Sequence, residues 1–158
     1  MRKLLISTAP PSTILIRIMI GGVFLGEGIQ KFLYSETMGS GRFEKIGIPS
    51  PDLMGPFVGS TEIVCGVLVL LGLATRYAVI PLLAIMAVAI FTTKIPILLG
   101  AEFFGFAPRS LDRYGLLGML HESRTDLSMT FGSLYLLIVG AGRWSLDAVL
   151  TTANNEDL

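Results

Sequence analysis

Four apolar stretches, each close to the length that crosses a bilayer, constrain this chain more than any other feature. They run over about residues 12–33, 55–73, 77–98 and 124–139. About 20 apolar residues in a helix are enough to span the hydrocarbon core of a membrane, where helices satisfy their own backbone hydrogen bonds. The pattern predicts an all-α protein, an integral membrane four-helix bundle that forms one domain over residues 1–158.

The composition is typical of a membrane protein with little mass outside the bilayer. Of the 158 residues, 52% are hydrophobic and 15% are charged, and 12 basic side chains balance 12 acidic ones. A balanced charge gives no argument for nucleic-acid binding. The single cysteine, Cys65, and the single histidine, His121, exclude a disulfide framework and a bis-histidine haem within this chain. We expect Cys65 to be a packing residue, His121 to lie in a polar loop, and no metal site.

The segments between the apolar stretches predict how the helices are connected. Residues 34–54 and 99–123 are polar or rich in Gly and Pro, and we predict two long loops there. Residues 72–76 are short enough to join two antiparallel helices. The sequence Ser123–Asp126 has the pattern of a capping box, which would start the fourth helix. A short terminal helix is expected to follow Ser145.

Charged side chains within or beside the apolar stretches are the candidate functional residues. A charge near the middle of a bilayer costs roughly 2.5–3.5 kcal/mol on insertion scales, so it usually faces a partner or a cavity. The helices alternate in direction, which brings five of these residues to the end of the bundle that carries the long loops. They are Glu27, Lys31, Glu62, Lys94 and Asp126. Their convergence predicts a polar pocket beneath the two loops.

The arginines belong to the opposite end, together with both termini. Arg17 lies on the glycine-bearing face of the first helix, which predicts that it points into the bundle. A structural alternative for Arg17 and Arg76, weaker than the one for Asp126 below, is a side chain that reaches the lipid headgroups. Arg143 and Trp144 are expected to be interface anchors, and Asp147 is expected to be a helix cap or an ion-pair partner.

The pocket residues also have structural interpretations. Glu27 and Lys31 are spaced i, i+4 and can pair on one helix. Glu62 has no partner in its own helix, so we expect Lys31 or Lys94 to reach it from another. Asp126 can be explained as a residue that completes a helix N-terminus. As functional residues, Glu62, Glu27 and Lys31 are the predicted catalytic or proton-accepting groups, and Arg17, Arg76, Asp126 and Lys94 are the predicted cofactor-contacting groups.

A series of short motifs extends over residues 14–150. They are Ile16-Arg17-Ile18, Gly21-Gly-Val-Phe24, Gly28-x-Gln30-Lys31, Gly47-Ile-Pro49, Glu62-x-x-x-Gly66, Gly72-x-x-Thr75-Arg76 and Gly140-Ala-Gly-Arg-Trp-Ser-Leu-Asp147. In this order the motifs resemble the DoxX family of small four-helix bacterial and archaeal membrane proteins. The resemblance implies a multi-pass protein of the cytoplasmic membrane. It also implies a link to oxidoreductase complexes, since DoxD-type members look like membrane subunits of thiosulfate:quinone oxidoreductases.

The functional prediction combines the pocket with this resemblance. The chain has no flavin, haem, metal or nucleotide motif, so we predict a quinone or other lipophilic-substrate pocket and a docking surface for a redox partner. Its expected partners are membrane lipids and other subunits of a membrane complex. Two alternatives use the same residues: a transporter of small solutes or protons, and a structural accessory subunit. Basic residues in the short segments, Arg2, Lys3, Arg76 and Arg143, favour termini in the cytoplasm, whereas a count over all loops favours the reverse orientation.

Overall fold

The computed structural model describes residues 9–156, with side chains described as far as Thr151. Arg2 and Lys3, which contributed to the predicted orientation, lie outside the described residues. The elements are α2 (Thr13–Leu33), α3 (Ser35–Met38), α4 (Ser40–Ile46), α5 (Pro51–Leu71), α6 (Thr75–Ala89), a π-helical turn η1 (Ile90–Lys94), α7 (Ile95–Leu99), α8 (Leu116–Val139) and α9 (Leu146–Glu156).

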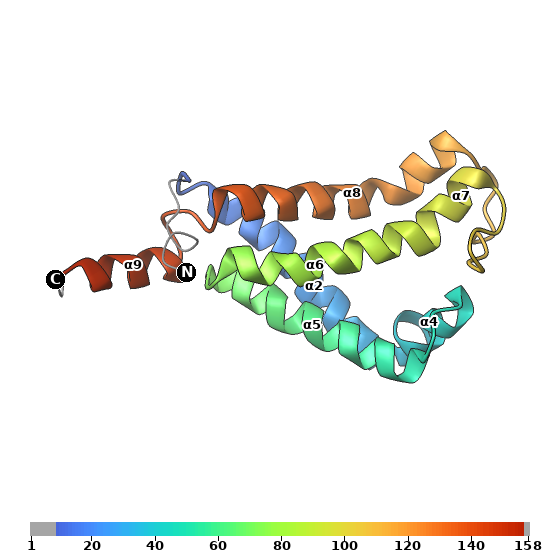
Figure 1. Ribbon diagram of the computed structural model, residues 1–158, viewed down its shortest axis with the longest axis horizontal. Helices are drawn as coiled ribbons and strands as arrows, with labels where there is room; N and C mark the ends of the chain where they lie inside the picture. The colour runs from blue at the N-terminus through green and yellow to red at the C-terminus, as the bar shows by residue number, and fades with distance from the viewer. Residues whose placement is uncertain (1–8, 157–158) are drawn as a thin grey trace.

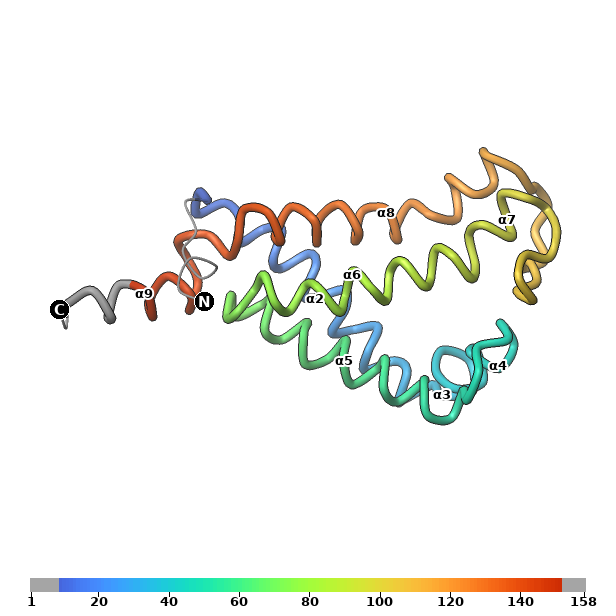
Figure 2. Tube along the Cα trace, viewed as in Figure 1, coloured from blue at the N-terminus to red at the C-terminus, as the bar shows by residue number. Residues whose placement is uncertain are grey.

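The four long helices form two pairs (Figure 1). α2 packs against α5, and the continuous rod of α6, η1 and α7 runs beside α8. The pairs lie close together at the end where residue 9 and α9 are found, which we call the terminal end. They diverge toward the other end, the loop end, where α4 and the connection between α7 and α8 lie (Figure 2). The predicted all-α membrane bundle of four helices is confirmed, and the expected terminal helix is present as α9.

Glycines explain how closely α2 and α5 approach each other. A Cβ atom at Gly28 would lie 2.7 Å from the carbonyl oxygen of Gly59, and one at Gly21 would lie 2.8 Å from that of Gly66. Small residues let helix backbones approach within a membrane, where van der Waals packing drives association. The α2/α5 pair is therefore packed backbone against backbone.

The apolar core lies between the two pairs and is confined to the terminal end and the middle of the bundle. Phe24 and Met129, both buried, mark the side of the core that faces the loop end. The other buried core residues are Ile20, Cys65, Val69, Ala78, Val79, Leu82 and Leu136. Cys65 is thus a packing residue, as expected.

The segment 34–54, predicted as a loop, contains two short helices and the start of α5. Its glycines and prolines do not interrupt these helices: Gly47, with φ +91°, ends α4, and Pro51 occupies the first turn of α5. The first turn tolerates proline because its N–H groups have no partner within the helix. The second and third spans also shift slightly, because Gly72 (φ +67°) ends α5 and α6 begins at Thr75.

The fourth helix begins at Leu116, so the predicted loop 99–123 is too long and the predicted capping box is wrong. Ser123 lies two turns inside α8 and is fully buried, and His121 is on the same helix, 3.1 Å from Arg124. The polar residues in the first half of α8 resemble a helix boundary in sequence. In the structure they belong to a continuous helix, with Ser123 inside the bundle and His121 and Arg124 exposed on its surface. Among the described residues, three helical segments are long and apolar enough to cross a membrane: α2, α5 and the rod Thr75–Leu99.

Candidate functional site

A cavity of about 660 Å³ lies between the two helix pairs where they diverge. The predicted convergence is found in the structure, because all five charged residues expected at the loop end line this cavity: Glu27, Lys31, Glu62, Lys94 and Asp126. Most of the remaining wall is apolar, including side chains from α2, α5, α6 and α8. The cavity thus combines a mainly apolar surface with a few charged groups, as small-molecule sites commonly do.

The wall formed by α2 and α5 carries three charges centred on Lys31. Its Nζ lies 2.7 Å from Oε2 of Glu62 and 3.7 Å from Oε2 of Glu27. Lys31 and Glu62 are almost fully buried, whereas the side chain of Glu27 is 45% exposed. The prediction that Glu62 finds a base on another helix is confirmed, and Lys31 is that base. Burial of either charge without its partner would cost several kcal/mol. Each of these two residues therefore needs the other to be stable in the folded protein.

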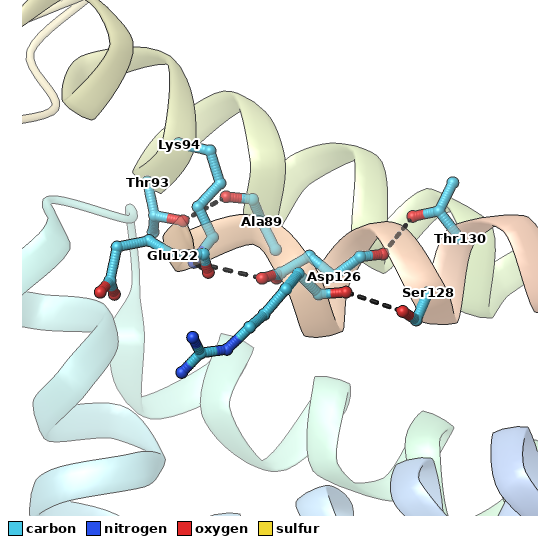
Figure 3. Close-up of polar contacts among 8 residues, drawn as sticks. Ala89, Thr93, Lys94, Glu122, Asp126, Ser128 and Thr130 are labelled. Carbon is cyan, nitrogen blue, oxygen red and sulfur yellow. Dashed lines mark hydrogen bonds and ion pairs between the residues drawn. The ribbon is translucent and has the colours of Figure 1, made fainter. Parts of the chain in front are cut away.

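The facing wall, formed by η1 and α8, carries a second ion pair. Nζ of Lys94 lies 3.2 Å from Oδ2 of Asp126 and donates a hydrogen bond of 2.9 Å to the carbonyl oxygen of Glu122 (Figure 3). Asp126 therefore lies within a helix and pairs with a neighbouring one, instead of completing a helix N-terminus. Its side chain is 20% exposed and that of Lys94 is 12% exposed. This pair is more accessible than the one between Lys31 and Glu62.

The π-helical turn η1 sets the position of Lys94. Two residues later Pro96 has no N–H group, so the hydrogen-bond pattern of an α-helix cannot continue without a break. Within the turn, the hydroxyl of Thr93 donates a hydrogen bond of 2.6 Å to the carbonyl oxygen of Ala89 (Figure 3). Such turns often occur at functional sites because they redirect the side chains of a long helix.

Two further charged residues line the cavity and were missed by sequence analysis. Arg42 comes from α4 and Glu122 from α8, both in segments predicted as loops. A signal for Arg42 was present: with Phe43 and Ile46 it forms one face of a short helix, and all three line the cavity. In Figure 3 the carboxylate of Glu122 extends away from Asp126.

Arg17 is also buried, but it lies at the terminal end, far from this cavity. It is 2% exposed and its guanidinium donates hydrogen bonds to four carbonyl oxygens, those of Val69, Leu70, Ala141 and Trp144. These carbonyls lie at the C-terminal end of α5 and just after α8. A helix C-terminus carries partial negative charge and favours a cation. Arg17 therefore joins three segments of the chain.

Arg76 and Asp147 also lie at the terminal end. Nη2 of Arg76 donates a hydrogen bond of 2.9 Å to the carbonyl oxygen of Ile138. The carboxylate of Asp147 accepts hydrogen bonds of 2.7 Å and 3.2 Å from the backbone N–H groups of Ala74 and Thr75, so it caps α6. Neither Arg17 nor Arg76 lines the cavity. The two arginines predicted to contact a cofactor are thus separated from the other candidates.

The cavity offers ammonium and carboxylate groups as hydrogen-bonding partners. Within the described side chains, no group of three or more His, Cys, Asp or Glu residues is placed to hold a metal ion. The two ammonium groups can donate hydrogen bonds from opposite walls, and the paired carboxylates can accept them. A molecule held in the cavity would therefore meet hydrogen-bond donors from two sides.

Comparisons with known proteins agree with this architecture. The model of the DoxX family matches residues 12–95, which include four of the five predicted pocket charges. An uncharacterized membrane protein of Mycobacterium tuberculosis is 50% identical over 149 residues, which cover 94% of this chain and 87% of that protein. No solved structure gives a significant match.

Proposed function

The chain belongs to the DoxX family, and we propose that it is the membrane subunit of an oxidoreductase system that holds a quinone or a similar lipophilic substrate between its helix pairs. One observation carries this proposal: a mainly apolar cavity of about 660 Å³ has an ion pair on each of two facing walls. A quinone requires the same combination, apolar surroundings for its ring and hydrogen-bond donors for two ring oxygens.

The chemistry assigns different tasks to the chain and to a partner. Reduction of a quinone to a quinol consumes two electrons and two protons. In this proposal Lys31 and Lys94 donate hydrogen bonds and then one proton each to the two ring oxygens. Glu62 and Asp126 hold the two lysines in place through their ion pairs, and protons taken up from water, on the side of the exposed Glu27, restore the two ammonium groups. The electrons come from a redox centre of a partner subunit, because one cysteine and one histidine do not provide the ligands for such a centre.

Binding of a benzoquinone with an alkyl tail to the purified protein in lipid nanodiscs tests the proposal. We expect saturable binding that becomes about tenfold weaker in Lys31→Met, because a hydrogen bond from a charged donor is lost. Lys45→Met is the matched control, since Lys45 is exposed on α4 and does not line the cavity. Equal affinity in the two variants, or no saturable binding, would contradict the proposal.

Deletion of the chain from its native membrane distinguishes this function from the two alternatives. We expect one quinone-linked activity to fall and to be restored by the wild-type chain but not by Glu62→Gln. Loss of solute or proton flux with all quinone-linked activities intact would favour a transporter. Disassembly of a larger complex, with the activity of its parts preserved, would favour a structural subunit.

A further inference from the structure

We propose that the ligand reaches the cavity sideways from the bilayer, between α5 and α6, and that the site therefore selects molecules with a polar head and a long apolar tail. This inference rests on the proposed function and specifies its substrate class. It depends on three features of the cavity: an apolar edge, a polar edge and a restricted loop end.

The edge between α5 and α6 is apolar and exposed. Phe57 of α5 and Val88 of α6 line the cavity, yet they are 62% and 54% exposed. They lie at the same level of the bundle, because α5 and α6 form an antiparallel hairpin. Phe57 lies 14 residues before the end of α5, and Val88 lies 13 residues after the start of α6. At about 1.5 Å per residue, both lie on the order of 20 Å from the hairpin. Phe57 and Val88 are thus apolar, exposed and at the margin of the cavity, so the gap between them would present an apolar opening to lipid.

The opposite edge, between α2 and α8, has a different character. Its cavity-lining side chains include Glu27, which is 45% exposed, together with Thr125 and Glu122. An apolar tail that left the cavity here would have to desolvate these polar groups, at a cost in free energy. Water and protons suit this edge, whereas the tail suits the edge between α5 and α6.

At the loop end the cavity is lined by Arg42, Phe43, Ile46 and Ile48 of the first long connection, and the second long connection approaches the first at one point. A Cβ atom at Gly47 would lie 3.4 Å from the carbonyl oxygen of Gly105, so the connections approach each other here. Three aromatic residues around Gly105, namely Phe103, Phe104 and Phe106, pack against Phe91 of η1 with ring centroids 5.4–6.2 Å apart. In this proposal the contact between the connections restricts access along the bundle axis and leaves the side between α5 and α6 as the route.

The size of the cavity supports the same substrate class. A volume of about 660 Å³ is within the range of small-molecule sites and accommodates a substituted ring. A polyprenyl or long alkyl chain attached to that ring exceeds the remaining space and must project from the cavity. The apolar edge gives this chain a path into the hydrocarbon region of the bilayer, and no polar group has to be desolvated along that path.

A photoreactive probe tests the route in the full-length protein in lipid nanodiscs. The probe is a dimethoxy-methyl-benzoquinone whose alkyl tail ends in a diazirine, and labelled peptides are identified by mass spectrometry. We expect saturable labelling on the peptides of α5 and α6 that contain Phe57 and Val88, abolished by an excess of the same quinone without the diazirine. Val88→Trp, which narrows this edge, should reduce labelling about tenfold. Ile80→Trp is the matched control, because Ile80 is 53% exposed on the same helix but does not line the cavity.

The outcomes separate the route from the function. Saturable labelling could instead be found on peptides that contain Gly47 or Gly105, or on peptides that contain Glu27 or Thr125, and not on those that contain Phe57 and Val88. Either result would overturn the sideways route and leave the binding site in place. Equal labelling in Val88→Trp and Ile80→Trp would also overturn the route. Absence of any competable labelling would refute the proposed function itself.

Discussion

The two ends of this bundle both bury charge, but they surround it differently. At the terminal end, Arg17 is enclosed by backbone carbonyls at helix ends, in close-packed surroundings. At the loop end, Lys31 and Glu62 pair across two helices and face a cavity. A buried charge in a membrane helix is often taken as a sign of function. If the proposed function is right, the partner of a buried charge and the free space beside it distinguish a structural role from a functional one.

This difference predicts two kinds of mutational effect. Changes at the terminal end should lower stability and leave ligand affinity alone once the protein is folded. Changes at the loop end should affect both, and the ratio of the two effects should depend on how accessible each ion pair is.

Arg17→Met should have the largest effect. It leaves four carbonyl groups without their donor and removes the link between three segments, so we expect the free energy of unfolding to fall by about 4 kcal/mol. Unfolding of the protein in mixed detergent micelles, followed by circular dichroism, measures this loss. Arg143→Met is the control and should leave stability unchanged, because Arg143 is exposed. Similar values for the two variants would show that the hydrogen bonds of Arg17 contribute little.

Lys31→Met should have the next largest effect, because it leaves the buried carboxylate of Glu62 without its partner. We expect a loss of about 3 kcal/mol in the same assay. The double variant Lys31→Met/Glu62→Gln should recover at least half of that loss, since removal of both charges avoids burial of an unpaired one. Additive losses in the double variant would show that the two residues do not act as a pair.

The sequence predicted the fold and the pocket to the extent that both depend on simple periodic patterns. Apolar length identified the helices, and alternating helix direction was enough to bring Glu27, Glu62 and Lys94 to one level of the bundle. Glycine spacing indicated the close face of α2, which the contact of Gly28 with Gly59 confirms. These features follow from local geometry, so no knowledge of tertiary contacts was needed.

The sequence failed where tertiary contacts override local signals. Ser123–Asp126 matches a capping box, but α8 continues through it because Ser123 is buried against the bundle and Asp126 pairs with Lys94. Arg42 was missed because the glycines around α4 suggested a loop. The carbonyl partners of Arg17 cannot be read from sequence, since a backbone oxygen carries no residue-specific signal.

Lys94→Met sharpens the comparison within the loop end. Lys94 and Asp126 are more exposed than Lys31 and Glu62, so water screens the charge that remains, and we expect a stability loss of roughly 1–2 kcal/mol. The affinity for the alkyl benzoquinone should nevertheless fall as much as in Lys31→Met, about tenfold, because each lysine donates to one ring oxygen. Lys45→Met again provides the control. Unchanged affinity in Lys94→Met would remove the η1/α8 wall from the proposed site.

Asp147→Asn should have the smallest effect, and it tests whether the two ends are independent. The carboxylate caps α6 through Ala74 and Thr75, and an asparagine keeps only one acceptor oxygen, so we expect a stability loss of about 1 kcal/mol. The affinity for the alkyl benzoquinone should be unchanged, because Asp147 does not line the cavity at the other end of α6. Glu36→Ala, at an exposed position of α3, should change neither quantity. If Asp147→Asn weakened binding as strongly as Lys94→Met, the α6 rod would couple its cap to the cavity, and the division into a structural and a functional end would be wrong.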